Sequence, residues 1–174
     1  MKNNLTKTRK LVNLSMLLAL AIVLSIVEGM FPPLPYAIAG VKMGLSNIPV
    51  MFTLFFINPF SAFAVAFLKS VFVLLTRGFI AGILSLSGGM LSILIMIILQ
   101  KIFREKISYL ILSISGAVFH NIGQLIAVSV IYTSVNIFIY LPVLLIAGVV
   151  AGVITSVLLK IIMPSFYVIT GVKK

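Results

Sequence analysis

The chain has 174 residues, of which 62% are hydrophobic and 9% are charged, and its mean hydropathy is +1.33. It contains no aspartate and no cysteine, and its two acids are Glu28 and Glu105. This composition excludes a soluble domain and most catalytic chemistry, because metal-diphosphate sites, paired carboxylates and aspartate-held triads need acids that are missing. We therefore expect no catalytic residues, no metal site and no cofactor.

Repeated apolar runs of about 20 residues predict an all-α integral membrane protein with one six-helix transmembrane domain over residues 1–174. We expect the first run to be a retained helix rather than a cleaved signal peptide. The second and third runs are short for a bilayer, which predicts tilting or partial shielding by protein. In chain order, the expected spans are residues 11–27, 43–57, 60–76, 79–100, 107–133 and 141–163.

The formal net charge of +11 is concentrated at the flanks of these spans, which predicts topology rather than binding to nucleic acid. Six spans place both termini on the same side of a lipid bilayer. With both termini in the cytoplasm, ten of the thirteen Lys and Arg residues lie in inner segments. The positive-inside rule therefore predicts this orientation in the cell membrane.

The first span carries two features that bear on function. Ser15 and Ala19 are small residues four apart, a spacing that permits close helix contact, so a partner subunit could dock there on the cytoplasmic side. Glu28 ends the span on the outside.

The second span is entered through Gly40-Val41-Lys42-Met43-Gly44-Leu45-Ser46-Asn47. Helix N-termini attract anions, so Lys42 and Asn47 are candidate ligand contacts, with an ordinary helix entry as the alternative.

Lys69 lies about ten residues into the third span, where a lysine is costly unless it has a partner or a role. It either snorkels to the outer surface, pairs with Glu28, or faces a cavity and binds an anionic substrate. Arg77 follows at the turn to the fourth span. With Lys42, these residues give the outer half three cations and one acid, which favours an anionic or strongly hydrogen-bonding ligand that enters from outside.

Spans four and five carry the remaining candidates. The pair Gly88-Gly89 predicts close helix packing. His120, Asn121 and Gln124 are three or four residues apart and share one face of the fifth span. They either hydrogen-bond between helices or form the polar wall of a binding site, and we favour the wall. A lone histidine without acids or thiols makes a poor metal site.

Together these stretches resemble the substrate-binding S components of energy-coupling-factor (ECF) transporters, and more closely the Gx transporter family, often labelled heptaprenyl diphosphate synthase component I. The matching pieces are Leu18-Ala19-Leu20-Ala21-Ile22-Val23-Leu24-Ser25 with Glu28, the Gly40–Asn47 stretch, Gly88-Gly89, and Gly116-Ala117-Val118-Phe119-His120-Asn121-Ile122-Gly123-Gln124.

The resemblance implies a six-helix S component that binds a vitamin-like micronutrient from outside. It further implies association with a membrane coupling subunit and two cytoplasmic ATPase subunits. The family label suggests prenyl diphosphate synthesis, but such an enzyme needs aspartate-rich motifs to hold magnesium. The alternatives are a non-catalytic accessory subunit in prenyl diphosphate or quinone precursor metabolism, a stand-alone secondary transporter, and a purely structural membrane protein.

Overall fold

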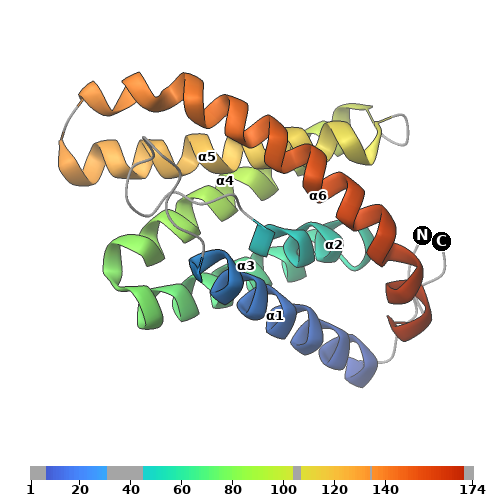
Figure 1. Cartoon of the computed structure of the whole chain (residues 1–174). Coiled ribbons are helices and arrows are strands. Elements are labelled where there is room, and N and C mark those ends of the chain that lie inside the picture. Colours follow the sequence, from blue (N-terminus) through green and yellow to red (C-terminus); the bar gives the residue numbers. More distant parts are fainter. Residues whose placement is uncertain (1–6, 31–44, 104–106, 134, 171–174) are drawn as a thin grey trace.

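The structure, a computed structural model, describes residues 7–30, 45–103, 107–133 and 135–170. Every element in these ranges is a helix (Figure 1). In chain order they are α1 (Lys7–Met30), the 3₁₀ helix η1 (Leu45–Asn47), α2 (Ile48–Phe56), α3 (Pro59–Arg77), α4 (Phe79–Phe103), α5 (Tyr109–Tyr132), the 3₁₀ helix η3 (Val135–Tyr140) and α6 (Leu141–Thr170).

The turns on either side of α3 lie where the sequence predicts them. At the start, the Asn58 side chain accepts a hydrogen bond from the Ser61 backbone N–H at 2.7 Å, which caps the helix. At the end, Gly78 adopts a φ of 90°, a backbone conformation that side-chain-bearing residues rarely adopt. The turn at Gly78 separates α3 from α4 and so places Arg77 beside the start of α4.

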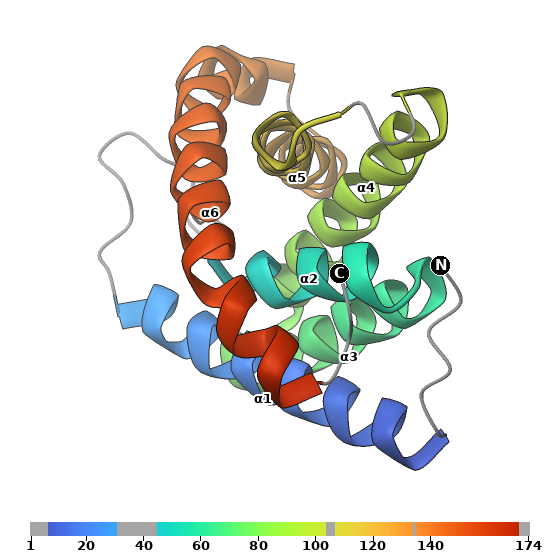
Figure 2. The ribbon, with the colours of Figure 1, turned by 90° about the vertical axis from the view of Figure 1, so that its right-hand side faces the viewer.

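The helices pack in a continuous arrangement (Figures 1 and 2). Helices α1 and α2 pack against α3, α3 packs against α4, and α5 lies between α4 and α6. Glycines bring α5 close to both neighbours. A Cβ atom on Gly123 would lie 2.8 Å from the Ser87 carbonyl oxygen, and one on Gly152 would lie 2.4 Å from the Ile114 Cα atom. The backbones of α4, α5 and α6 can therefore approach where a larger residue would separate them.

The short helix α2 lies at the centre of the core. Its residues Val50, Met51 and Leu54 pack in an apolar cluster with α1, α3, α4 and α5. Ile48 and Phe52 pack in a second cluster with residues of α1 and α6. All residues from 46 to 54 are buried, so protein rather than lipid surrounds this segment.

Five described helices are long and apolar enough to cross a membrane, and η1 with α2 is a sixth, shorter apolar segment. The predicted all-α membrane fold is confirmed. The second predicted span, 43–57, contains the helical segment Leu45–Phe56, which is shorter than the roughly 20 residues that a bilayer requires, as the sequence predicts. Its predicted shielding by protein is confirmed by the burial of α2.

The last helix extends further than the sequence predicts. We expected it to end at residue 163, before a proline, but α6 continues through Pro164 to Thr170. A proline removes one backbone hydrogen bond, and in a membrane helix neighbouring groups can compensate for the loss. The apolar segment that could cross a membrane, Ile137–Pro164, ends next to the predicted end of the span at residue 163.

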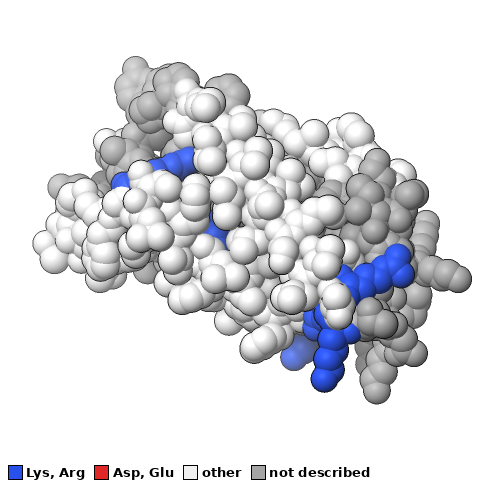
Figure 3. Space-filling model, turned by 90° about the horizontal axis from the view of Figure 1, so that it is seen from below, with Lys and Arg blue, Asp and Glu red and all other residues white. Residues whose placement is uncertain are grey.

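Exposed cations mark one end of the molecule. Lys7 and Arg9 begin α1, Lys101 lies in the last turn of α4, and all three are exposed. Figure 3 shows the largest gathering of Lys and Arg side chains at one end of the face it presents, with smaller patches near its middle and toward its other end. Glu28 lies near the other end of α1, and this helix of 24 residues is about 36 Å long at 1.5 Å per residue. A site at Glu28 is thus about one bilayer thickness from the cations that begin the helix.

Candidate functional site

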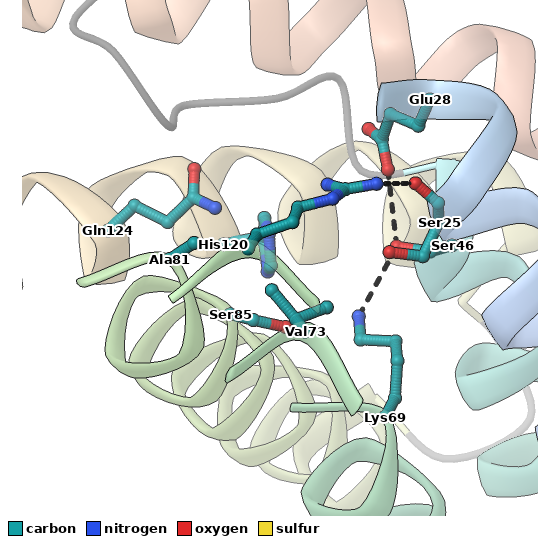
Figure 4. Close-up of a pocket in the computed structure, with 10 residues that line it drawn as sticks. Ser25, Glu28, Ser46, Lys69, Val73, Ala81, Ser85, His120 and Gln124 are labelled. Atoms are coloured by element: carbon teal, nitrogen blue, oxygen red, sulfur yellow. Dashed lines mark hydrogen bonds between the residues drawn. The ribbon is translucent and has the colours of Figure 1, made fainter. Parts of the chain in front are cut away.

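A pocket opens between α1, α3, α4, α5 and η1 (Figure 4). Among its ten lining residues, Val73 and Ala81 are the apolar ones and the other eight are polar or charged. The space enclosed between the side chains would hold about two water molecules. The lining residues are Ser25, Glu28, Ser46, Lys69, Val73, Arg77, Ala81, Ser85, His120 and Gln124.

One side of the pocket is a hydrogen-bonded chain that we call the α3 network, formed by Glu28, Ser46, Asn47 and Lys69. The Glu28 carboxylate accepts hydrogen bonds from the Leu45 backbone N–H and the Ser46 hydroxyl, each at 3.2 Å. The Lys69 ammonium donates to the Asn47 side-chain oxygen at 2.6 Å and to the Ser46 hydroxyl at 3.4 Å. Figure 4 shows Lys69 and Glu28 on opposite sides of Ser46.

The α3 network decides between the three interpretations of Lys69. Its side chain is only 1% exposed, so it does not snorkel to the surface. Instead it connects to Glu28 through the Ser46 hydroxyl and lies in the wall of the pocket. Burying an ammonium group is costly unless its hydrogen bonds are made, and two of them are made here by η1.

Arg77 reaches across the pocket from the end of α3 to the end of α1. Its guanidinium donates to the backbone carbonyl of Ser25 and lies against Gly29. A Cβ atom on Gly29 would lie 2.4 Å from the Arg77 Nη2 atom, so the glycine leaves the room that the guanidinium occupies. Arg77 is half-buried, whereas Lys69 is fully buried, and the two cations thus lie at different depths of one pocket.

The opposite side is the α5 wall, formed by His120 and Gln124. Each side chain is 4% exposed. Within the described residues, the His120 Nδ1 and Gln124 Oε1 atoms are buried and have no hydrogen-bond partner, although the histidine ring packs against the backbone at Gly88. A buried polar atom that makes no hydrogen bond costs about 1–3 kcal/mol. The α5 wall therefore has hydrogen-bonding atoms whose polar partners the described part of the chain does not supply.

The remaining predicted site residues lie outside this pocket lining. The Asn121 side chain donates to the Leu144 carbonyl of α6 at 2.9 Å, which is the interhelical role that the sequence left open. Asn47 does not line the pocket but holds Lys69. Lys42 lies outside the described residues. Ser15 and Ala19 are exposed on α1, away from the pocket lining.

Three serines of the pocket were not among the predicted site residues. Ser25 lies three residues before Glu28, so helical spacing alone places both on one face of α1. Ser46 directly precedes the predicted site residue Asn47. The Ser85 hydroxyl lies 3.2 Å from that of Ser70, and the sequence offers no signal that distinguishes these serines from those used only for packing.

Gly88 has the packing role that the sequence predicts for the glycine pair. A Cβ atom on Gly88 would lie 2.7 Å from the His120 Nδ1 atom and 2.8 Å from the His120 carbonyl oxygen. A Cβ atom on Gly89 would meet only the Ala66 side chain, at an ordinary 3.7 Å. Gly88 is therefore the member of the pair that lets the α5 wall approach α4.

A family model described as heptaprenyl diphosphate synthase component I matches residues 17–162. The chain belongs to this family. The match to the heptaprenyl diphosphate synthase component I family includes every residue that lines the pocket, and it confirms the family resemblance predicted from the sequence. A comparison with curated proteins gave no match.

The fold of this component I chain is similar to a solved structure described as the S component of a bacterial ECF transporter. The TM-score is 0.65 at 20% sequence identity, and the similarity covers 92% of this chain and 96% of the other. The predicted S-component-like bundle is therefore confirmed as a fold.

Proposed function

We propose that the protein is the membrane-embedded substrate-binding subunit of an ECF-type importer and that its cargo is a small anionic micronutrient. The observation that carries the proposal is the polar pocket, which lies inside an S-component-like fold and contains Lys69 and Arg77 against one acid, Glu28. Two cations and one carboxylate leave one excess positive charge among the described lining residues. An anionic ligand would compensate this charge in a low-dielectric setting.

The position of the pocket fits uptake from outside. It lies near the Glu28 end of α1, and the cations Lys7 and Arg9 begin the other end. The positive-inside rule assigns the cationic end to the cytoplasm, so both termini are cytoplasmic and the pocket opens in the outer half of the membrane. Substrate binding therefore precedes release to the inside, which requires energy from a partner.

We assign docking of the partner to the exposed α1 surface at Ser15 and Ala19. These small residues are one helical turn apart, and they lie in the half of α1 that the charge pattern places toward the cytoplasm. Small residues permit close approach between membrane helices. The proposed partners are an ECF coupling subunit in the membrane and two cytoplasmic ATPase subunits.

Co-expression with a coupling subunit and its ATPases tests the assembly. We expect the proteins to purify as one complex and native mass spectrometry of the isolated chain to reveal a retained anionic molecule. Ala19→Leu should weaken the complex while ligand retention persists. Ala64→Leu is the matched control, because Ala64 is an exposed alanine on α3. Association that is insensitive to Ala19→Leu would refute the docking surface, and a chain that never associates would refute the transporter role.

The description of the family supports a second candidate, a non-catalytic accessory subunit in prenyl diphosphate or quinone precursor metabolism. It predicts that the chain binds isopentenyl diphosphate and stimulates a separate synthase. Uptake by vesicles that contain this chain alone would instead favour a secondary transporter. The ECF role is preferred over both because the fold similarity and the charged pocket support the same activity.

A further inference from the structure

We infer that the ligand is a small acid that also carries N–H or O–H donors, with its anionic group on Arg77 and its donors against the α5 wall. This inference rests on the proposed function, because it describes the cargo of the same pocket. It adds a division of roles: Arg77, His120 and Gln124 recognise the ligand, whereas Lys69 is a positioning residue within the α3 network.

The requirement for a donor comes from Gln124. Gln124 lines the pocket, and its Oε1 atom is buried and has no hydrogen-bond partner among the described residues. An amide oxygen only accepts hydrogen bonds, so the complementary ligand atom must donate. The nearby His120 Nδ1 atom, also buried and without a partner in the described part of the chain, can accept or donate. A purely carbon-based ligand edge would leave both atoms unsatisfied.

The assignment of the anionic group to Arg77 follows from the contrast with Lys69. Two hydrogen bonds, of 2.6 and 3.4 Å, tie the Lys69 ammonium to η1, and it has only three donors. The Arg77 guanidinium has five donors in a planar fork, and its hydrogen bond to the Ser25 carbonyl uses Nη2. Since Arg77 is also half-buried rather than fully buried, it can bind a carboxylate or phosphate without dismantling the α3 network.

The pocket lining also disfavours a long hydrocarbon tail. Small-molecule sites that bury apolar groups are lined mainly by apolar side chains. Here Val73 and Ala81 are the apolar residues among ten in the described lining, polar atoms contribute about half of the lining surface, and the enclosed space is small. A five-carbon prenyl group would desolvate serines, a carboxylate and an amide without hydrogen-bonding to them. The chemistry of the site thus favours a compact polar acid over an isoprenoid.

A matched pair of probes tests the inference on the full chain in lipid nanodiscs. Pyroglutamate and 3-oxocyclopentanecarboxylate share a five-membered ring, a ring carbonyl and one carboxylate, but only pyroglutamate carries a ring N–H. Isothermal titration calorimetry should show pyroglutamate binding about tenfold more tightly, which corresponds to one buried hydrogen bond. Gln124→Met should bring the two affinities together. Arg77→Met should weaken both probes and leave their ratio unchanged.

Asn121→Ala is the matched control, because Asn121 lies on the same helix but bonds to α6. It should retain the preference for pyroglutamate. Equal affinities for the two probes, no binding of either at millimolar concentration, or a preference that survives Gln124→Met would each overturn the inference. So would isopentenyl diphosphate binding more tightly than pyroglutamate. Failure of the proposed function would differ from failure of this inference. In that case the chain would still bind pyroglutamate more tightly than the second probe, but it would not associate with coupling and ATPase subunits.

Discussion

The two sides of the pocket differ in how their polar groups are satisfied. The α3 network joins Glu28 and Lys69 through η1 by hydrogen bonds between 2.6 and 3.4 Å. The α5 wall instead presents buried His120 and Gln124 atoms without partners among the described residues. Satisfied buried groups stabilise a fold, whereas unsatisfied ones cost stability and persist where they serve binding. The comparison separates the α3 network, which its own hydrogen bonds hold together, from the α5 wall, which we propose contacts the ligand.

The largest expected effect comes from breaking the α3 network. Lys69→Met leaves the buried carboxylate of Glu28 without the cation linked to it through Ser46. We expect the free energy of unfolding to fall by about 3–5 kcal/mol, the usual result of removing one partner of a buried charge pair. Chemical denaturation in mixed micelles, followed by circular dichroism, measures the change.

The double variant Lys69→Met with Glu28→Gln sharpens this prediction. Because both charges are removed together, the double variant should be less destabilised than the sum of the two single variants, by at least about 0.5 kcal/mol. Strict additivity would mean that Glu28 and Lys69 are not coupled through Ser46, and the α3 network would then not be one unit.

An intermediate effect is expected where the α5 wall approaches α4. Gly88→Ala would bring a Cβ atom within 2.8 Å of the His120 backbone oxygen, so α4 and α5 must separate. Overpacking of this kind costs about 1–3 kcal/mol and would displace His120 from the pocket. Unfolding measurements and ligand titration should both register the loss.

Gly89→Ala is the control for Gly88→Ala, since its Cβ atom would lie at an ordinary 3.7 Å from Ala66. It should leave both stability and ligand affinity nearly unchanged. If the two alanine variants behave alike, close approach at Gly88 is not what positions the α5 wall.

The smallest effects separate two neighbouring amides of α5. Asn121→Ala removes a hydrogen bond to the Leu144 carbonyl and should cost about 1 kcal/mol of stability, with ligand affinity unchanged. Gln124→Met removes an acceptor without a described partner and should leave stability unchanged or slightly higher, with ligand affinity reduced. A stability loss for Gln124→Met as large as that for Asn121→Ala would contradict the distinction between them.

Much of this architecture could be predicted from the sequence, for one physical reason. Polar side chains in apolar membrane helices are costly against lipid, so Glu28, Lys69, His120 and Gln124 had to face the interior. Helical spacing then placed His120 and Gln124 on one face. The structure brings all four into one pocket with Arg77, and the family match confirms the relationship that the motifs indicated.

Other features depend on packing that no single segment encodes. Asn121 shares the polar stretch with His120, but one residue corresponds to a rotation of about 100° around the helix, which turns its side chain toward α6. The burial of α2 on all sides depends on how α1, α3 and α6 surround it. The role of Ser46 as the link between an acid and a lysine follows only from the position of η1.

Asn47 has a further consequence for the design of this chain. It directly precedes α2, but its side-chain oxygen binds Lys69 rather than capping the helix. An aspartate would suit both neighbours better locally, since it favours helix N-termini and would pair with the ammonium. It would also cancel the excess positive charge of the pocket region. If the proposed function holds, the amide at Asn47 gives up local stability and leaves the positive charge of the pocket available to an anionic ligand.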